Sequence, residues 1–504
     1  MRLEFKKGER VFNKKLFLLI LCSSLLVLIA GLTSVLSLGD EVFHYRFAKD
    51  IFNAGSRVAI DPLYDNGYPP GGYYNSGPLW HTLLAALWGL SGKISFPIAQ
   101  FYHTIYYALL ILFTYLLGKE LYGQKQGLYS ALIIATTPVV IAFSVLFYVD
   151  IPATCLSILC LLLIVKRRFL LSGIILGLMY LTKRNTCFFV PVFFFLILYQ
   201  PETNFWEKAK NFFYLFVPAC LFVFPDLLWR ENNLKTTVIV LENGRKVSMP
   251  SVGTLEGIKN RFISFHWRIR VSEYLNSSLF NPVDIVKYFG IILLIALAIY
   301  TLLKLYKKKD LILWLPVICY FLFFCYLFHP GSDIRYLLPI VPLLAILSSK
   351  VIAKYFNKKW LKILLVFLCF LQFSSAVLYV RAKRQIPKGI IEGFTYLRDN
   401  TASDAMIIYP EYVILDAANR RFSWAGNLSV VLTDLFWNKD GDKVRDLLKS
   451  NDVDFIAVKK SRIYDDSKVH HFGGYPKSFV ERLPKLPFVK LVFDNKEMSI
   501  WEVK

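Results

Sequence analysis

Two adjacent carboxylates, Asp40 and Glu41, follow the first long apolar run of the chain, within the sequence GDEVFH. An ionised carboxylate can accept the proton of an attacking hydroxyl, which is general-base catalysis. Three cations, Lys183, Arg184 and Arg335, also stand at the ends of apolar runs. Cationic side chains can hold a phosphate group, and arginine can do so with two hydrogen bonds. These residue types indicate a site where a base activates a hydroxyl beside a bound phosphate.

Several of these candidates have a structural alternative. Asp40 is a good N-cap residue for a helix over 41–54. Asp150 ends the sequence FYVD and precedes Ile151-Pro152, so it either caps the next helix or belongs to the site. His329 could donate to a phosphate or simply end a helix. His44, His81 and His103 lack the spacing of metal ligands, and packing or an interfacial hydrogen bond is the alternative for each.

The chain that carries these residues has the composition of a membrane protein. It has 504 residues, of which 56% are hydrophobic, and its mean hydropathy is +0.47. The first apolar run can cross a bilayer and lacks the cleavage site of a removable signal, so we expect a retained signal anchor. Apolar runs broken by charge, Pro and Gly predict about eleven transmembrane helices. They are 16–38, 98–118, 127–147, 151–165, 169–182, 186–199, 212–229, 285–303, 311–328, 336–349 and 361–380.

Lysine and arginine residues predict the orientation, because they are enriched in cytoplasmic loops. With the N-terminus in the cytoplasm, every later cytoplasmic loop is basic. The net charge of +23 is therefore mainly a topology signal. No nucleic-acid partner is expected, because the basic residues are not gathered on one soluble face. The predicted cytoplasmic loops are 119–126, 166–168, 200–211, 304–309 and 350–362.

The opposite ends of the spans carry the candidate site. Polar residues are costly within a membrane, so five polar clusters on one face suggest one site, although ordinary polar loops are the alternative. The clusters are 40–41, 67–78, 147–150, 182–185 and 329–335. We expect a polytopic α-helical membrane domain over 1–385, with outer loops at 39–97 and 230–284. An odd number of spans then places residues 386–504 outside, as a soluble α/β domain.

Smaller elements can also be predicted. The apolar run 78–90 is too short to cross and suggests an interfacial or re-entrant helix. Asn243-Gly244 between apolar runs predicts a two-residue hairpin, and 254–275 suggests a helix lying on the membrane. The tail alternates helix-like and strand-like runs. Its predicted helices are 388–400, 411–420, 441–451 and 477–484, and its predicted strands are 405–410, 454–460, 488–495 and 497–504.

In their order and rough spacing, the polar clusters resemble the motifs of GT-C glycosyltransferases, multi-span enzymes that use polyprenyl- or dolichyl-phosphate sugars. Over about residues 16–350, the chain looks most like the dolichyl-phosphate-glucose α-1,2-glucosyltransferase family. The large outer tail is more similar to aminoarabinose transferases and protein O-mannosyltransferase relatives. The matching stretches are 40–44 (DEVFH), 70–73 (PGGY), 148–150 (YVD), 183–186 (KRNT) and 329–336 (HPGSDIRY).

The resemblance implies an inverting displacement with Asp40 as the base, while Glu41 orients a sugar and Asp150 contributes to the catalytic site. For the donor phosphate we predict Arg335, Lys183, Arg184 and His329 as ligands. For the sugar or the acceptor we predict His44, Tyr73, Asn185 and Asp333. Asn75 and Ser76 stand where aminoarabinose transferases carry an acid and a lysine, so no metal ligands are assigned. A divalent metal, Mg²⁺ or Mn²⁺, stays open as a cofactor.

The sequence thus predicts an integral-membrane glycosyltransferase with its site on the non-cytoplasmic face of the plasma, inner or endoplasmic reticulum membrane. Its expected partners are a polyprenyl- or dolichyl-phosphate sugar, a glycan, lipid or protein acceptor, and membrane lipids. We find no ATP-binding pattern, so the energy has to come with the substrate. A lipid or glycan transporter, or an assembly protein without turnover, are the alternatives. A transporter would show inverted repeats, and the sequence has no such internal likeness.

Overall fold

The computed structural model describes most of the chain. The described residues are 7–33, 40–55, 77–184, 189–199, 204–233, 237–240, 246–249, 282–327, 334–355, 363, 367–376, 380, 386–402, 404–409, 421–424, 435–450, 452–465 and 475–504. The chain divides into two compact units. The first unit comprises Met1–Val35, Ser76–Asp226 and Phe265–Lys383, and the second comprises Leu36–Asn75, Leu227–Ser264 and Arg384–Lys504.

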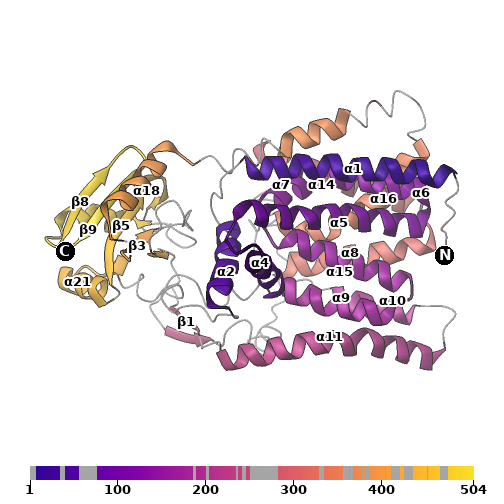
Figure 1. Ribbon diagram of the computed structural model, residues 1–504, viewed down its shortest axis with the longest axis horizontal. Helices are drawn as coiled ribbons and strands as arrows, with labels where there is room; N and C mark the ends of the chain where they lie inside the picture. Colours follow the sequence, from indigo (N-terminus) through magenta and orange to yellow (C-terminus); the bar gives the residue numbers. More distant parts are fainter. Residues whose placement is uncertain are drawn as a thin grey trace. The chain divides into compact units, whose positions relative to one another are not determined.

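The first unit is a bundle of apolar helices, drawn from indigo to orange in Figure 1. Its first helices are α1 (Lys7–Leu32), α4 (Leu79–Ser91), α5 (Phe96–Tyr122), α6 (Gln124–Thr136), α7 (Pro138–Val145), α8 (Asp150–Val165) and α9 (Phe169–Thr182). They are followed by α10 (Val190–Leu198), α11 (Phe205–Asn233), α14 (Pro282–Lys304), α15 (Leu311–Leu327) and α16 (Val341–Tyr355). Two 3₁₀ helices, η3 (Lys308–Asp310) and η4 (Ile334–Ile340), precede α15 and α16.

Several of these helices suit a bilayer, and the chain is an integral membrane protein. Among the described residues, four helices are long and apolar enough to cross a membrane, and the bent pair α6–α7 would make a fifth. The four are Lys14–Leu32, Phe96–Tyr122, Phe205–Trp229 and Arg335–Tyr355. Shorter apolar helices lie within most of the other predicted spans, and the total of about eleven stays a prediction. The predicted short helix at 78–90 is observed as α4.

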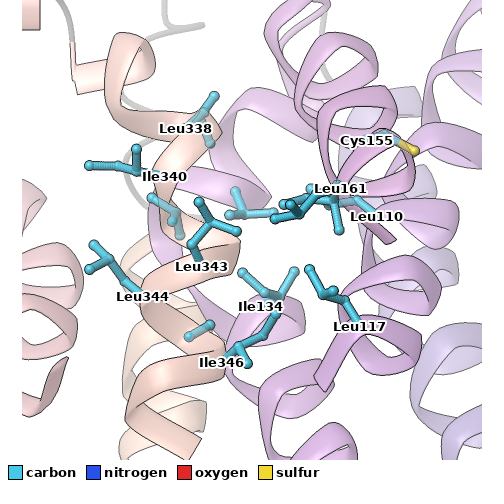
Figure 2. Packing of buried hydrophobic residues seen from close by; sticks show 14 of the residues in the cluster. Leu110, Leu117, Ile134, Cys155, Leu161, Leu338, Ile340, Leu343, Leu344 and Ile346 are labelled. Atoms are coloured by element: carbon cyan, nitrogen blue, oxygen red, sulfur yellow. The ribbon is translucent and has the colours of Figure 1, made fainter. Parts of the chain in front are cut away.

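The core of the bundle forms around α16. Every residue of α16 from Val341 to Ala353 is buried, which explains why this helix shows no polar stripe. Figure 2 shows its side chains, including Leu343 and Ile346, facing Leu110 of α5 and Ile134 of α6. Exposed apolar side chains instead cover the outer helices, as Leu221 does on α11 with 70% of its surface exposed. Lipid tails can cover such a surface, which fits a membrane bundle.

Buried charged and polar side chains form a network at one end of this bundle. Asp310, with no exposed surface, binds Lys350 Nζ at 2.5 Å and accepts a hydrogen bond from the Tyr122 hydroxyl at 2.6 Å. Lys309 donates to the Leu121 carbonyl, while burial and the neighbouring Lys307 lower the pKa of Lys309. The network thus joins three segments that the sequence assigns to, or next to, cytoplasmic loops, so these segments share one end of the bundle.

The first segments of the second unit are α2 (Asp40–Ala54) and the strands β1 (Thr237–Val240) and β2 (Lys246–Met249). The two strands pair antiparallel, with Thr237 opposite Met249 and Val240 opposite Lys246. The predicted pairing of these two segments as a hairpin is therefore confirmed, whereas the predicted two-residue turn at Asn243-Gly244 lies outside the described residues and stays a prediction. The predicted surface helix at 254–275 also lies outside them.

The tail of the second unit is an α/β domain with a five-stranded mixed sheet in the order β4-β3-β5-β9-β8. β3 pairs parallel with β4 and β5, whereas β9 pairs antiparallel with β5 and β8. The sheet strands are β3 (Met406–Tyr409), β4 (Arg421–Trp424), β5 (Val453–Lys459), β8 (Val489–Asp494) and β9 (Met498–Val503). A short parallel pair, β6 (Ile463–Tyr464) with β7 (Tyr475–Pro476), lies apart from this sheet. The helices are α18 (Lys388–Asn400), α21 (Gly441–Ser450) and α22 (Lys477–Arg482), with 3₁₀ turns η5 (Lys460–Arg462) and η7 (Leu483–Lys485).

Side chains alternate across this sheet and form two cores. Met406 and Ile408 of β3 pack with Leu448 of α21, whereas Ile407 and Tyr409 pack with helix α18. Successive strand residues point to opposite faces, so a buried strand can serve helices on both sides. Figure 1 shows α18 and α21 on either side of the sheet. The predicted helices and strands of the tail are confirmed, except for 411–420, which lies outside the described residues; β4 was not predicted.

Candidate functional site

A helical hairpin brings together two residues predicted for the site, Asp150 and Lys183. Asp150 begins α8 and Lys183 directly follows α9, and the two antiparallel helices are joined by the short turn at 166–168. The Lys183 ammonium pairs with the Asp150 carboxylate, and only 12% and 4% of the two side chains are exposed. α8 has no side-chain cap, so the alternative role of Asp150 as an N-cap is not observed.

The second cation of the site, Arg335, lies beside Lys183 on a shared aromatic ring. The Lys183 ammonium lies 5.1 Å from the centre of the Tyr336 ring, and the Arg335 guanidinium lies 4.9 Å from it. Arg335 also donates to the Tyr336 hydroxyl at 3.1 Å and lies 4.8 Å from the Tyr148 ring. We call Tyr148, Asp150, Lys183, Arg335 and Tyr336 the basic cluster. Two cations and one carboxylate leave it with one excess positive charge, which suits an anion.

The backbone of Tyr336 is fixed by η4, a 3₁₀ helix of seven residues. Runs of this type longer than three or four residues are uncommon and often occur where a segment is functionally constrained. The Tyr320 hydroxyl donates to the Tyr336 carbonyl at 2.7 Å, which holds η4 against α15. Arg335 and Tyr336 are therefore presented at the start of a span whose remainder, α16, is buried.

The segment that carries Tyr148 and Asp150 is held by α5. α7 is a separate helix because Pro138 cannot continue α6, and the two helices meet at an angle of 56°. The last carbonyls of a helix have no partner within it. His103 Nε2 donates to the Phe143 carbonyl at 3.1 Å, and the Gln100 side chain donates to the Ser144 carbonyl at 3.2 Å. The interfacial hydrogen bond considered for His103 is thus observed.

The short helix α4 packs against the same end of the bundle. The Gly77 amide donates to the Thr182 carbonyl at 3.0 Å, next to Lys183. A Cβ atom at Gly77 would lie 1.8 Å from the Leu181 carbonyl oxygen, so only glycine allows this approach. His81 Nδ1 donates to the Gly77 carbonyl at 3.2 Å, and the Trp80 ring lies 4.6 Å from the Phe147 ring. Four of the predicted polar clusters therefore meet, at 77–78, 147–150, 182–184 and 335.

Arg184 points to a different partner from that of its neighbour Lys183. Its guanidinium lies 3.4 Å from the Asp226 carboxylate of α11 and 5.7 Å from the centre of the Tyr180 ring. Asp226 is almost completely buried. The structure therefore places Lys183 and Arg335 together in the basic cluster and pairs Arg184 with Asp226.

The acidic pair Asp40-Glu41 and His44 belong to the second unit. α2 begins at Asp40, and both Glu41 and His44 are buried. Because the two units are described separately, the proximity of Asp40 to the basic cluster stays a prediction from sequence. Tyr73, Asn185, His329 and Asp333 lie outside the described residues, so their predicted roles also stay predictions.

Sequence reasoning missed several residues that build this end of the bundle. Asp226 carried a usable signal, because it is a carboxylate within the predicted span 212–229 and such residues are functional candidates by default. Tyr336 adjoins Arg335, but its position between two cations depends on tertiary packing. Gln100 gave no local signal, because its partner is a main-chain carbonyl on another helix. Among the described residues, no group of three or more His, Cys, Asp or Glu side chains could hold a metal ion.

Comparisons with known proteins agree with this architecture. Residues 75–229 match the family described as dolichyl-phosphate-mannose-protein mannosyltransferase. Residues 282–414 match the Alg9-like mannosyltransferase family. No curated protein sequence matches the chain. The first match covers the helices that supply Asp150, Lys183 and Asp226, and the second covers Arg335.

The fold is similar to those of several solved membrane glycosyltransferases. ArnT from Cupriavidus metallidurans bound to undecaprenyl phosphate is 12% identical, with a TM-score of 0.62 over 96% of this chain and 97% of that one. The oligosaccharyltransferase of Archaeoglobus fulgidus with Zn and sulfate is 15% identical, with a TM-score of 0.61 over 88% and 68%. The mycobacterial arabinofuranosyltransferase AftD is 11% identical, with a TM-score of 0.54 over 96% and 41%.

A mostly helical bundle with apolar spans and a small mixed sheet at its C-terminus defines the ArnT-like GT-C fold. Together with the two matching families, it identifies the chain as a membrane glycosyltransferase of the GT-C type. The expected likeness of the overall architecture to aminoarabinose transferases is confirmed, because the ArnT match spans almost the entire chain, including the tail.

Proposed function

We propose that this glycosyltransferase moves a sugar from a polyprenyl- or dolichyl-phosphate donor to an acceptor hydroxyl on the non-cytoplasmic face of the membrane. The acceptor is a lipid-linked glycan, another lipid or a protein. The observation that carries the proposal is the basic cluster, in which Lys183 and Arg335 share the Tyr336 ring at one end of an apolar bundle. Cations at the end of a membrane bundle can hold the phosphate of the donor, while the apolar helices accommodate the lipid tail of the donor.

In the proposed reaction, the acceptor oxygen attacks the anomeric carbon of the donor sugar. The bond between that carbon and the phosphate oxygen breaks, and the lipid phosphate leaves with the bonding electrons. Because the displacement is direct, the anomeric configuration inverts, and one base, Asp40, suffices to take the proton of the attacking hydroxyl. The phosphate gains negative charge as the bond breaks, so Lys183 and Arg335 stabilise the transition state more than the bound donor.

Asp150 fits an orienting role better than the role of a base. Its carboxylate is paired with Lys183, and an ion pair holds the long lysine side chain in one direction. Glu41 is proposed to orient the sugar. His329 is proposed to contact the donor phosphate. Four further residues are proposed to contact the sugar or the acceptor, namely His44, Tyr73, Asn185 and Asp333. The proposed reaction assigns no step to a metal.

The test is mass spectrometry of lipid-linked sugars in a strain that lacks the gene, combined with transfer assays on purified protein in liposomes. We expect the donor lipid to accumulate in the deletion strain and one glycosylated product to disappear. Wild-type protein should restore the product, whereas the Lys183→Met variant should not. Lys210→Met is the matched control, because Lys210 is an exposed lysine of α11 that lies over Tyr214. Purified protein that moves the lipid across the bilayer without transferring a sugar would instead be a transporter.

A further inference from the structure

α9 and α11 approach each other closely at two glycines of α9. A Cβ atom at Gly173 would lie 2.3 Å from the Leu215 carbonyl oxygen, and one at Gly177 would lie 2.6 Å from a ring carbon of Phe222. Gly173 and Gly177 are four residues apart and therefore lie on one face of α9. Glycines at this spacing let two membrane helices approach closely. Figure 1 shows α11 running beside α9 at the edge of the bundle.

At the end of this contact, the two helices are joined by the ion pair between Arg184 and Asp226. Arg184 Nη2 lies 3.4 Å from Asp226 Oδ2, and only 14% and 2% of the two side chains are exposed. A carboxylate buried in a membrane helix is expensive, and such residues usually serve a function. The proposed reaction gives Asp226 no role, because its charge is directed at Arg184.

The two ion pairs act on consecutive residues of one segment. Lys183 has an extended backbone, with φ −153° and ψ 117°, and in extended chain successive side chains point to opposite sides. Lys183 accordingly meets Asp150 of α8, whereas Arg184 meets Asp226 of α11. The segment after α9 is therefore held by one ion pair on each of its two sides. Loss of either pair would remove one of the side-chain contacts that hold the segment presenting Lys183 to Tyr336.

We infer that Asp226 is a positioning residue for the donor-phosphate site: by holding Arg184 it fixes the segment that carries Lys183. This inference rests on the proposed function. It assigns Arg184 to the support of the site instead of to direct contact with the phosphate. The remaining exposed face of α11, with Leu221 and Phe224, meets lipid and needs no further partner.

The inference is tested by donor kinetics of the purified protein in liposomes. Asp226→Asn should raise the KM for the donor lipid phosphate about tenfold and leave the KM for the acceptor unchanged. Asp226→Glu, which keeps the charge, should recover part of the donor KM. Glu207→Gln is the matched control, because Glu207 is an exposed carboxylate in the first turn of the same helix. It should behave as wild type.

Removal of one charge leaves the other buried and could prevent folding. The double variant Arg184→Gln/Asp226→Asn avoids that cost, because it removes both charges. We expect it to fold and yet to show the raised donor KM, and its thermal unfolding is measured in parallel. A wild-type donor KM in the double variant overturns the inference, whatever its stability. If donor KM is also unchanged in Lys183→Met and Arg335→Ala, the proposed phosphate site itself is wrong.

Discussion

The Lys183 ammonium forms a buried ion pair with the Asp150 carboxylate, 33 residues earlier in the chain. The pair ties the end of α9 to the start of α8 and leaves the lysine beside Tyr336. An ion pair that is nearly buried has lost most of its hydration, and it persists only where the surrounding structure compensates.

Lys183→Met should lower kcat/KM for the donor by about 10- to 100-fold, because a charge-assisted bond to phosphate contributes about 1.5–3 kcal/mol. Asp150→Asn should have a smaller effect, about tenfold, since the lysine is present but no longer held. Steady-state transfer assays measure both. A complete loss of turnover in Asp150→Asn, with normal donor binding, would show that Asp150 is the base.

Arg335→Ala should weaken use of the donor by about 10- to 100-fold. Arg335→Lys should recover only part of this loss, because lysine lacks the planar fork that donates to the Tyr336 hydroxyl and is proposed to bind the phosphate. Donor binding is measured with the protein in liposomes. Arg168→Ala is the control, as Arg168 is an exposed arginine at the turn between α8 and α9. Unchanged donor affinity in Arg335→Ala would make Arg335 an interfacial anchor.

Asp40→Asn should abolish transfer while the protein still folds and inserts. The substitution keeps the size of the side chain, but an amide cannot act as a general base. Transfer assays and a size-exclusion profile of the purified variant check the two parts. Asp50→Asn, in the same helix, is the control. Activity within a few-fold of wild type would refute Asp40 as the base.

The orientation of the spans predicts which positions are accessible from outside the cell. A cysteine introduced at Ser450, in the exposed end of α21, should react with a membrane-impermeant thiol reagent on intact cells. A cysteine at Lys308 should react only after the membrane is opened, because the sequence predicts that this basic loop is cytoplasmic. Both are placed in a protein whose native cysteines are replaced. Labelling of Ser450→Cys only after permeabilisation would mean that the predicted number of spans is wrong by at least one.

The network at Asp310 predicts an order of stabilities. Asp310→Asn should lower the unfolding temperature in detergent, because a buried lysine left without its partner costs about 3–5 kcal/mol. The double variant Asp310→Asn/Lys350→Met should be more stable than the single one, since no buried charge is left alone. Lys166→Met tests an exposed pair, Lys166 with Glu120 at 3.4 Å, and should change little. Equal unfolding temperatures for the single and double variants would contradict the prediction.

Local patterns were sufficient for much of the fold. The apolar runs predicted where most helices of the bundle lie, because length and hydropathy decide whether a segment can cross a membrane. Strand-like runs such as those at 405–410 and 454–460 predicted β3 and β5, and Asn243-Gly244 predicted the hairpin of β1 and β2. The break at Pro138 was missed, since 127–147 has the length of one span although the structure divides it into α6 and α7.

Local sequence patterns could not predict which distant segments pair with each other. The sequence placed Lys183 and Arg184 in one of the five polar clusters, but it could not tell that each would meet a different carboxylate. The partner of each cation depends on which helices lie next to α9. The packing of Gly173 against α11 is a tertiary contact, which local sequence patterns do not reveal. The parallel pairing of β3 with β4 is a tertiary feature of the same kind.

The pair of Asp310 and Lys350 also has a consequence for biosynthesis. The two residues are 40 positions apart, so α15 reaches the membrane before the lysine that neutralises its neighbouring carboxylate has been made. Lys350, in turn, is buried in α16, and a buried lysine without its partner is destabilising by about 3–5 kcal/mol. The contact between η3 and α16 is therefore stable only when both charges are present. This end of the bundle would accordingly close late, after α16 has been synthesised.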